Sequence, residues 1–254
     1  MDKYKAVCFD LDGTVYRGKE VIPEAAELIS TLRKMGTVPY YVTNNSSMTT
    51  GQLKAKLSSF GIQAEEDHIM TSAIAAAAYC KEHFDGASVM MIGEEGLRAA
   101  LLEQGFTLTD RNPDIVVMGI DREANYAKLA EACLAIRAGA AFIATNGDKA
   151  FPTERGLVPG NGSFVKLMEF ATDVVPVIVG KPEPHMLHFI QKAGGFKKDE
   201  MVMIGDNYET DIEAGLRFGI DTIHVEGGVT SREIVLKAAK QPTYLFSKLT
   251  DWNK

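Results

Sequence analysis

The sequence predicts an α/β fold in which parallel sheets are covered by helices on both faces. Short apolar runs that do not alternate with polar residues recur along the chain, as they do in strands buried on both faces. Helical patterns lie between these runs, and strands that alternate with helices form parallel βαβ units. The length of 254 residues, of which 46% are hydrophobic, suffices for one large α/β domain or two ordinary ones.

The predicted strands are the apolar runs at residues 6–9, 38–42, 89–92, 115–118, 142–144, 201–204 and 222–225. The predicted helices share apolar residues at helical spacing and a glycine just beyond the last turn. They cover residues 23–35, 50–60, 95–104, 126–137 and 211–218. An alanine-rich stretch at residues 73–78 is expected to form a helix at a domain junction.

Charge and cysteine usage exclude several classes of protein. The 27 Lys and Arg residues and 34 Asp and Glu residues give a net charge of -7, so the chain offers no basic field for nucleic acid. Three cysteines, far apart and odd in number, predict neither a disulfide framework nor a zinc site. No run approaches the roughly 20 apolar residues of a membrane span. We therefore expect a cytoplasmic protein without a nucleic-acid or membrane partner.

Two carboxylates follow the first predicted strand. Asp10 and Asp12 are two residues apart in an extended chain, so their side chains point the same way and share one site. Two like charges this close need a cation between them, or one must be protonated. Gly13 lets the chain turn out of the strand, and open α/β sheets bind ligands at the carboxyl ends of their strands. A solvated turn is the alternative interpretation.

Two further motifs are suited to phosphate. Thr43 and Asn44 end the second predicted strand, where small hydrogen-bond donors suit phosphate oxygens, although both residue types are also ordinary turn formers. Lys181 follows the apolar run 174–179 and lies between a glycine and a proline. A lysine fixed there supplies a point charge for a phosphoryl group, whereas an isolated lysine is usually a solvated surface charge.

The last motif is acidic. Asp206 ends the predicted strand 201–204, where it can ligate a hard cation. Asp211 begins the next helix and can orient that cation or its waters, or serve as a helix cap.

In this order, the motifs resemble the four motifs of the haloacid dehalogenase (HAD) superfamily. The resemblance spans almost the whole chain, and no motif residue is missing. The fuller runs are similar to subfamily IIA, the NagD-like sugar and nucleotide phosphatases, and comprise residues 10–18, 43–47, 180–184 and 205–215. The resemblance implies a HAD-type Rossmann-like parallel sheet core with an inserted α/β cap domain of the C2 type.

The spacing of the motifs indicates where the cap is inserted. Asp10 and Thr43 are 33 residues apart, which leaves room for one helix and one strand, whereas 138 residues separate Thr43 from Lys181. The insertion therefore follows the second motif. We expect a core domain at residues 1–80 and 179–254 and a cap domain at residues 81–178.

Within the expected cap, residues 146–162 are rich in glycine, proline and asparagine. This segment is too long for a routine connection and is expected to be a functional loop that faces the substrate. Gly160 and Gly162 are interpreted as turn residues. The candidate specificity residues in and beside the loop are Asn146, Asp148 and Arg155.

The resemblance implies a Mg²⁺-dependent phosphatase that hydrolyses phosphomonoesters of small metabolites, either sugar phosphates or nucleoside monophosphates. Asp10 would attack phosphorus and carry an aspartyl-phosphate. Asp12 would protonate the leaving oxygen and then activate water. The phosphoryl oxygens would be bound by Thr43, the Asn44 backbone amide and Lys181.

The implied metal ligands are the Asp10 side chain, the Asp12 backbone carbonyl and Asp206. Asp211 would orient these ligands without binding the metal itself.

Two other functions use similar residues. One is phosphotransfer, as in related phosphomutases, which usually carry the cap between the first two motifs. The other is a phospho-accepting receiver module, which is about half this length and does not need Asp12.

Overall fold

The computed structural model describes residues 3–253, and its chain divides into two compact units. Unit 1 contains the described residues up to Thr43, Gly51–Met70 and the chain from Lys181 onward. Unit 2 contains Asn44–Thr50 and Thr71–Gly180. The alanine-rich stretch is a helix, α3 (Ser72–His83), and it is grouped with unit 2. The domain boundaries expected from the sequence stay a prediction.

Unit 1 is built on a sheet whose strands lie in the order β15-β14-β13-β1-β4-β5. Strand β1 pairs in parallel with β13 and β4, and β14 pairs in parallel with β13 and β15. All residues of β1 and β13 are buried, as expected for central strands covered on both faces. The strands are β1 (Ala6–Asp10), β4 (Val38–Thr43), β5 (Ile69–Thr71), β13 (Met201–Gly205), β14 (Asp221–Val225) and β15 (Tyr244–Phe246).

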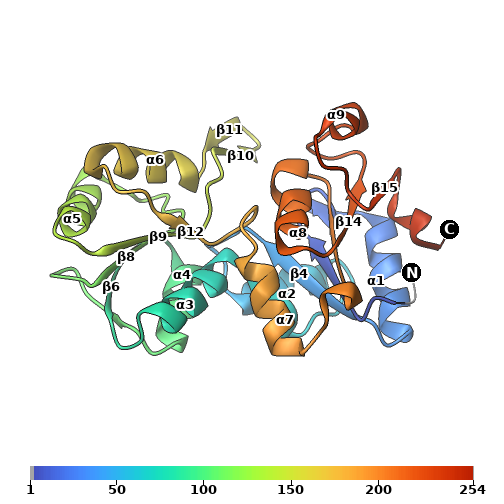
Figure 1. Ribbon diagram of the computed structural model, residues 1–254, viewed down its shortest axis with the longest axis horizontal. Coiled ribbons are helices and arrows are strands. Elements are labelled where there is room, and N and C mark those ends of the chain that lie inside the picture. Colours follow the sequence, from blue (N-terminus) through green and yellow to red (C-terminus); the bar gives the residue numbers. More distant parts are fainter. Residues whose placement is uncertain (1–2, 254) are drawn as a thin grey trace. The chain divides into compact units, whose positions relative to one another are not determined.

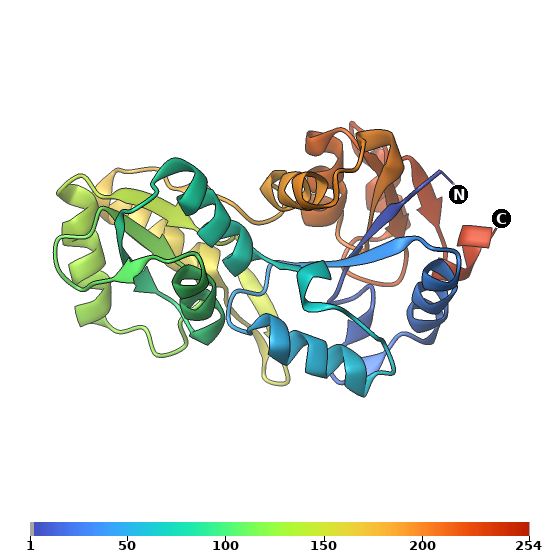
Figure 2. The same cartoon turned by 90° about the horizontal axis from the view of Figure 1, so that it is seen from below.

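Helices cover both faces of this sheet (Figure 2). Helices α1 (Pro23–Lys34) and α2 (Thr50–Ser59) lie on one face, and α7 (His185–Gly194) and α8 (Glu213–Phe218) lie together on the other. Smaller elements complete the unit: β2 (Tyr16–Arg17), β3 (Glu20–Val21), η1 (Glu66–His68), η2 (Lys198–Glu200), η3 (Tyr208–Ile212), α9 (Arg232–Lys237) and η4 (Leu249–Asn253).

Unit 2 is built on a second parallel sheet, with strands in the order β12-β9-β8-β6-β7. Helices α5 and α6 cover one face, while α3 and α4 cover the other (Figure 1). Ala132, Ile136, Val165 and Met168 of α5 and α6 form an apolar core with buried residues of the sheet. The elements are β6 (Ser88–Ile92), α4 (Glu95–Glu103), β7 (Thr107–Leu108), β8 (Ile115–Met118), α5 (Tyr126–Arg137), β9 (Ala141–Ala144), α6 (Asn161–Thr172) and β12 (Val177–Ile178).

The predicted α/β fold is confirmed, because every predicted strand is a strand of one of the two parallel sheets. The predicted helices are also present, although the one expected at residues 211–218 begins earlier, as the π-helical turn η3, and continues as α8. In the part of the chain that the structure describes, no helix is long and apolar enough to cross a membrane.

The expected functional loop at residues 146–162 is instead mostly regular structure. Strands β10 (Ala150–Thr153) and β11 (Gly156–Pro159) form an antiparallel hairpin, and α6 begins at Asn161. The hairpin turn fits its sequence, because Gly156 adopts a φ of 112°, which side chains disfavour. The start of the helix was missed because Pro159, Gly160 and Gly162 lie at or just before its first turn.

Gly160 and Gly162 are not turn residues. Gly160 is the N-cap of α6 and Gly162 lies in its first turn, and both are buried. A Cβ atom at Gly160 would overlap the carbonyl of Asp148, and one at Gly162 would overlap the carbonyl of Gly147. These glycines therefore permit close approach of two backbone segments.

Replacing Gly162 with alanine should destabilise the protein, although alanine normally favours a helix. We expect Gly162→Ala to lower the free energy of unfolding by about 1–3 kcal/mol, because the new methyl group meets a backbone carbonyl that cannot move freely. Leu167→Ala, at an exposed position of the same helix, should change it by less than about 1 kcal/mol. Urea unfolding of both variants tests this, and a Gly162→Ala protein as stable as wild type would contradict it.

Candidate active site

Unit 1 gathers three buried aspartates at the carboxyl end of its sheet. Asp10 is the last residue of β1, and Asp206 directly follows β13, the parallel neighbour of β1. Asp211 lies in η3, one turn further along the chain. Each of the three offers a carboxylate oxygen within 4.8 Å of the others. The parallel pairing thus brings together residues that are far apart in the sequence.

Lys181 is the cation of this cluster. Its Nζ lies 2.6 Å from Asp10 Oδ1 and 2.8 Å from Asp211 Oδ1, and it donates a hydrogen bond of 3.1 Å to the carbonyl of Val42. Only 2% of Lys181 is exposed. The interpretation of a solvated surface charge is therefore wrong for Lys181.

Asp206 is held by groups from two other loops. Thr14 Oγ1 donates to its Oδ1 at 3.0 Å, and the Val229 amide donates to its Oδ2 at 2.7 Å. Gly13 and Gly228 pack against the carboxylate so closely that a Cβ atom at either position would overlap it. The glycine of the first motif is thus required both for its φ of 105° and for space.

Asp211 is fixed by the start of its own helix. The Asn207 amide donates to Oδ2 at 3.1 Å, and the Thr210 hydroxyl donates to Oδ1 at 3.1 Å. A Cβ atom at Gly205 would overlap the Asp211 carboxylate, which explains the glycine of the last motif. Asn207, and not Asp211, is the N-cap of this helical turn, and the Asp211 carboxylate instead accepts from the amide of that cap residue.

The pKa values reflect this crowding of charge. Burial raises the pKa of Asp10 well above its ordinary value, the carboxylate of Asp211 raises it further, and Lys181 opposes both. Burial and Asp211 likewise raise the pKa of Asp206. For Lys181, burial lowers the pKa, but the carboxylates of Asp10 and Asp211 outweigh it, so the pKa lies above its ordinary value. The site is therefore short of positive charge.

Asp12 differs from the other carboxylates because its side chain is exposed. Protein atoms around the carboxyl group nevertheless desolvate it enough to raise its pKa, against the opposing effects of Lys56, the Tyr16 hydroxyl and Lys181. Tyr16 donates to Asp12 Oδ2 at 3.3 Å. Asp12 thus combines access from solvent with a shifted proton affinity.

The cluster fits a hard divalent cation. Three buried carboxylates face one ammonium group. If all three are ionised, an excess of negative charge remains in a buried site, where water screens it little. A divalent ion balances that excess, and carboxylate oxygens are the ligands that such ions prefer. All three carboxylates lie within reach of one ion, and the oxygens of both Asp206 and Asp211 also accept hydrogen bonds from the protein.

Thr43 and Asn44 lie where the chain leaves unit 1. Thr43 is the buried last residue of β4, and Asn44 is the first residue assigned to unit 2. Asn146 donates to the Asn44 carbonyl at 2.8 Å, and Asp148 accepts from Asn44 Nδ2 at 3.1 Å. Arg155 is an exposed residue in the turn of the β10–β11 hairpin. The structure thus brings two of the three candidate specificity residues to Asn44.

Sequence reasoning missed the groups that hold Asp206. Thr14 belongs to the first motif, and its spacing from the aspartates could have marked it as a partner. Val229 contributes only its amide, so no side-chain pattern could identify it. Gly227 and Gly228 lie just beyond β14, and this pair of glycines could have indicated that the backbone there approaches another group closely.

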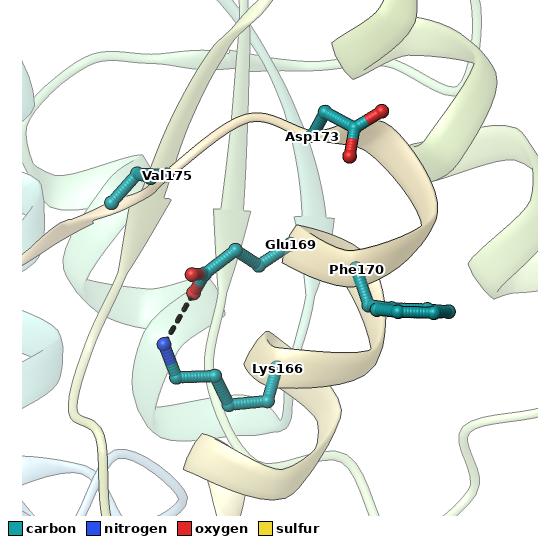
Figure 3. Close-up of a pocket in the computed structure, with 5 residues that line it drawn as sticks. All are labelled: Lys166, Glu169, Phe170, Asp173 and Val175. Carbon is teal, nitrogen blue, oxygen red and sulfur yellow. Dashed lines mark hydrogen bonds and ion pairs between the residues drawn. The ribbon is translucent and has the colours of Figure 1, made fainter.

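Unit 2 also carries a pocket on its surface, beside the C-terminal part of α6 (Figure 3). The pocket is lined by Lys166, Glu169, Phe170, Asp173 and Val175, and Lys166 pairs with Glu169 at 2.6 Å. The Phe170 ring points away from this ion pair. No motif residue lines this pocket, so it is separate from the carboxylate site.

Removing the charge of Lys181 should destabilise unit 1. We expect Lys181→Met to lower the free energy of unfolding by about 3 kcal/mol at pH 7 in EDTA, because Asp10 and Asp211 lose their buried partner. Lys181 has a raised pKa and stays charged from pH 5 to 8, so the loss should shrink at pH 5 only through protonation of the carboxylates. The exposed Lys237→Met is the control. Equal stability of both variants in chemical denaturation would contradict this assignment.

The chain matches known hydrolases over nearly its whole length. Residues 7–107 match a family model for haloacid dehalogenase-like hydrolases, and residues 178–252 match a HAD-hydrolase-like model. It is 48% identical over 253 residues to the 5'-nucleotidase YutF of Bacillus subtilis, covering 99% of this chain and 98% of that protein. It is 44% identical over 252 residues to an acid sugar phosphatase of Staphylococcus aureus, covering 99% and 97%.

The fold is also similar to solved structures of phosphatases. A double mutant of the thermostable NPPase of Geobacillus stearothermophilus has a TM-score of 0.94 at 46% identity, covering 99% of each chain. The 4-nitrophenylphosphatase of Thermotoga maritima also has a TM-score of 0.94, at 31% identity, covering 99% of this chain and 97% of that one. The four motifs, the buried carboxylate cluster and these matches agree, and the chain belongs to the haloacid dehalogenase superfamily of hydrolases, in its NagD-like subfamily IIA.

Proposed function

We propose that this protein is a Mg²⁺-dependent phosphatase that hydrolyses phosphomonoesters of small metabolites through an aspartyl-phosphate on Asp10. One observation carries the proposal: the Asp10 carboxylate is held by Lys181 in a buried acidic cluster, while Asp12 is exposed two residues away. The relatives named above act on nucleotides, sugar phosphates or nitrophenyl phosphate according to their names, which supports a phosphomonoester substrate.

Asp10 is suited to be the nucleophile because its position is fixed. Lys181 orients the carboxylate through a bond of 2.6 Å to Oδ1 and reduces its repulsion from an anionic phosphate. In the first step a bond forms between Asp10 and phosphorus, and the bond between phosphorus and the leaving oxygen breaks. In the second step water attacks phosphorus, releases inorganic phosphate and regenerates the free carboxylate.

Asp12 is suited to transfer the protons of both steps. Its raised pKa favours the protonated acid that must be present when substrate arrives. It gives that proton to the leaving oxygen, and the resulting carboxylate then takes a proton from the attacking water. Tyr16, which donates to Asp12 Oδ2, keeps the carboxyl group oriented between the two steps.

The phosphoryl oxygens would be bound by the Thr43 hydroxyl, the Asn44 backbone amide and the Lys181 ammonium group. Mg²⁺, held by the Asp10 side chain, the Asp12 backbone carbonyl and Asp206, would supply positive charge between nucleophile and phosphate. Asp211 would support this arrangement indirectly, by holding Lys181.

The substrates we propose are sugar phosphates or nucleoside monophosphates. All of these share the phosphate group, which Thr43, the Asn44 amide and Lys181 would bind, so the leaving group must be distinguished by other residues. We propose that unit 2 makes this distinction. Arg155 is the candidate with an exposed cationic side chain in the hairpin turn, and Asn146 and Asp148 are the other candidates expected from the sequence.

Turnover should require Asp10. We expect wild type with Mg²⁺ to release phosphate from 4-nitrophenyl phosphate and from members of a panel of phosphorylated metabolites over many turnovers per chain. Asp10→Asn should abolish release, because an amide is not a nucleophile towards phosphorus. Asp67→Asn, an exposed aspartate in the same unit, should retain full activity. An Asp10→Asn protein that hydrolysed esters at the wild-type rate would refute the nucleophile, and one phosphorylation per chain would indicate a receiver module.

Mg²⁺ should stabilise the protein in the absence of substrate. At a concentration about 100 times its dissociation constant, the ion should add about 2.7 kcal/mol to the free energy of unfolding and raise the melting temperature by several degrees. Asp206→Asn should lose this shift, because it removes one charged ligand from the cluster. Differential scanning calorimetry with Mg²⁺ and with EDTA measures both proteins, and an equal shift in Asp206→Asn would exclude Asp206 as a ligand.

A further inference from the structure

The chain passes between the units next to two proposed phosphate ligands. One boundary between the units falls directly after Thr43, and another falls directly before Lys181. The backbone of Asn44 and of Gly180 therefore sets the course of the chain beside each ligand. Both of these residues contact the same short segment of unit 2, residues 145–148, which we call the anchor segment.

Asn44 is held on its backbone and on its side chain. Its carbonyl accepts hydrogen bonds from Ser72 Oγ at 2.7 Å and from Asn146 Nδ2 at 2.8 Å. Its Nδ2 donates to both carboxylate oxygens of Asp148, at 3.1 and 3.2 Å. These bonds restrict rotation of the peptide groups on either side of Asn44, including the amide proposed to bind phosphate.

Gly180 packs on the same group of residues. Its amide donates to the Thr145 carbonyl at 2.7 Å. A Cβ atom at Gly180 would overlap that carbonyl and would lie 2.7 Å from Asn44 Oδ1. Asn44 and Gly180, both residues of unit 2, thus lie against each other and against the anchor segment.

The anchor segment is itself rigidly held. Asn161, at the start of α6, donates from Nδ2 to the carbonyls of Asn146 at 2.9 Å and Met118 at 3.2 Å. Asn146 Oδ1 accepts from the Asp148 amide at 3.2 Å, and Gly162 lets the backbone of α6 approach the segment. Asn146 and Asn161 are at most 4% exposed. Burying polar groups is costly unless they are bonded, and the bonds of Asn146 and of Asn161 Nδ2 restrict the segment, although Asn161 Oδ1 has no partner among the described residues.

We propose that Asp148 and Asn146 are positioning residues that fix Asn44 and thereby align the phosphate-binding backbone beside Thr43 and Lys181. This inference rests on the function proposed above. A simple turn after β9 would not need a carboxylate that reaches Asn44. Because the aligned group binds phosphate, which all substrates share, loss of the alignment lowers turnover of every substrate by a similar factor.

A specificity role for Asp148 leads to a different result. Residues that contact the leaving group change the ranking of substrates and leave hydrolysis of a small aryl phosphate nearly unchanged. Comparing 4-nitrophenyl phosphate with the best metabolite ester therefore separates the two roles. Arg155→Ala provides the comparison within unit 2, since Arg155 is exposed in the hairpin turn.

The experiment is a double-mutant cycle on the full chain with Mg²⁺, using Asn44→Ala, Asp148→Ala and the double variant. Each single variant should lower kcat/KM about 10–100-fold on both substrates and raise the inhibition constant of inorganic phosphate. Asn44→Ala keeps the backbone amide, so a decrease in kcat/KM of this variant reports the alignment of that amide. The double variant should lose no more than either single variant, because both remove the same bond.

Two controls separate positioning from a general loss of structure. Asp148→Asn keeps an oxygen acceptor for Asn44 Nδ2 and should retain activity within about threefold of wild type. Asp110→Ala, at an exposed aspartate of the same unit, should match wild type. Rates are measured per folded protein, well below each melting temperature. If Asp148→Ala does not fold, Asn44→Ala and Asp148→Asn carry the same comparison.

The proposal is overturned if Asp148→Ala changes only its melting temperature, if its loss is confined to the metabolite ester, or if the two single losses add. Failure of the proposed function gives a different pattern. In that case wild type hydrolyses no phosphomonoester, or Asp10→Asn remains active. If wild type is active and Asp10→Asn is inactive, but no variant of the cycle changes kcat/KM, then only this inference is refuted and the proposed function stands.

Discussion

The ion pairs of Lys181 with Asp10 and Asp211 are the interaction on which the site depends. A buried carboxylate that loses its partner is strongly destabilising, so three of them can be collected at one sheet edge only with compensating positive charge. One lysine compensates part of this charge and also fixes the direction of the Asp10 carboxylate. The remaining excess of negative charge suits the same cluster to a divalent cation, so the electrostatic cost of assembling the site and its proposed affinity for metal have one origin.

The parallel sheet makes this collection of charge possible. Strands β1 and β13 are neighbours in space although most of the chain separates them, and their carboxyl ends meet at one edge. Local geometry then refines the site, since Gly13 and Gly228 leave space for the carboxylate of Asp206 and Gly205 leaves space for that of Asp211. An insertion between β4 and β13 leaves these strand ends in place, because the register of β1 with both neighbours depends only on residues of unit 1. Unit 2 can therefore be a complete α/β structure with its own core.

The sequence predicted the parts of the molecule that depend on local patterns. Buried central strands appear as short apolar runs, and the motif aspartates follow them directly, so both the fold and the carboxylate cluster were accessible. The hairpin of β10 and β11 was not predicted, because its strands are short, mostly exposed and contain proline. The partners of Asp206 and Asn44 were inaccessible for another reason: they are backbone amides and side chains from distant segments. Such contacts are set by tertiary packing, which periodicity does not encode.

Within unit 2, the anchor segment and the neighbouring hairpin differ in burial. This difference matters for the two roles proposed for the unit, which are positioning of Asn44 and recognition of the leaving group. Asn146 is buried and bonded in several directions, so a change there disturbs Asn44 and α6 together. Arg155 and Leu157, in contrast, are exposed on the hairpin, where substitutions cost little stability. A protein that must keep one phosphate-binding geometry while it adapts to different leaving groups can vary only the second region freely. The physical constraint therefore favours the proposed division of roles, in which residues 145–148 align the phosphate-binding backbone and the hairpin recognises the leaving group.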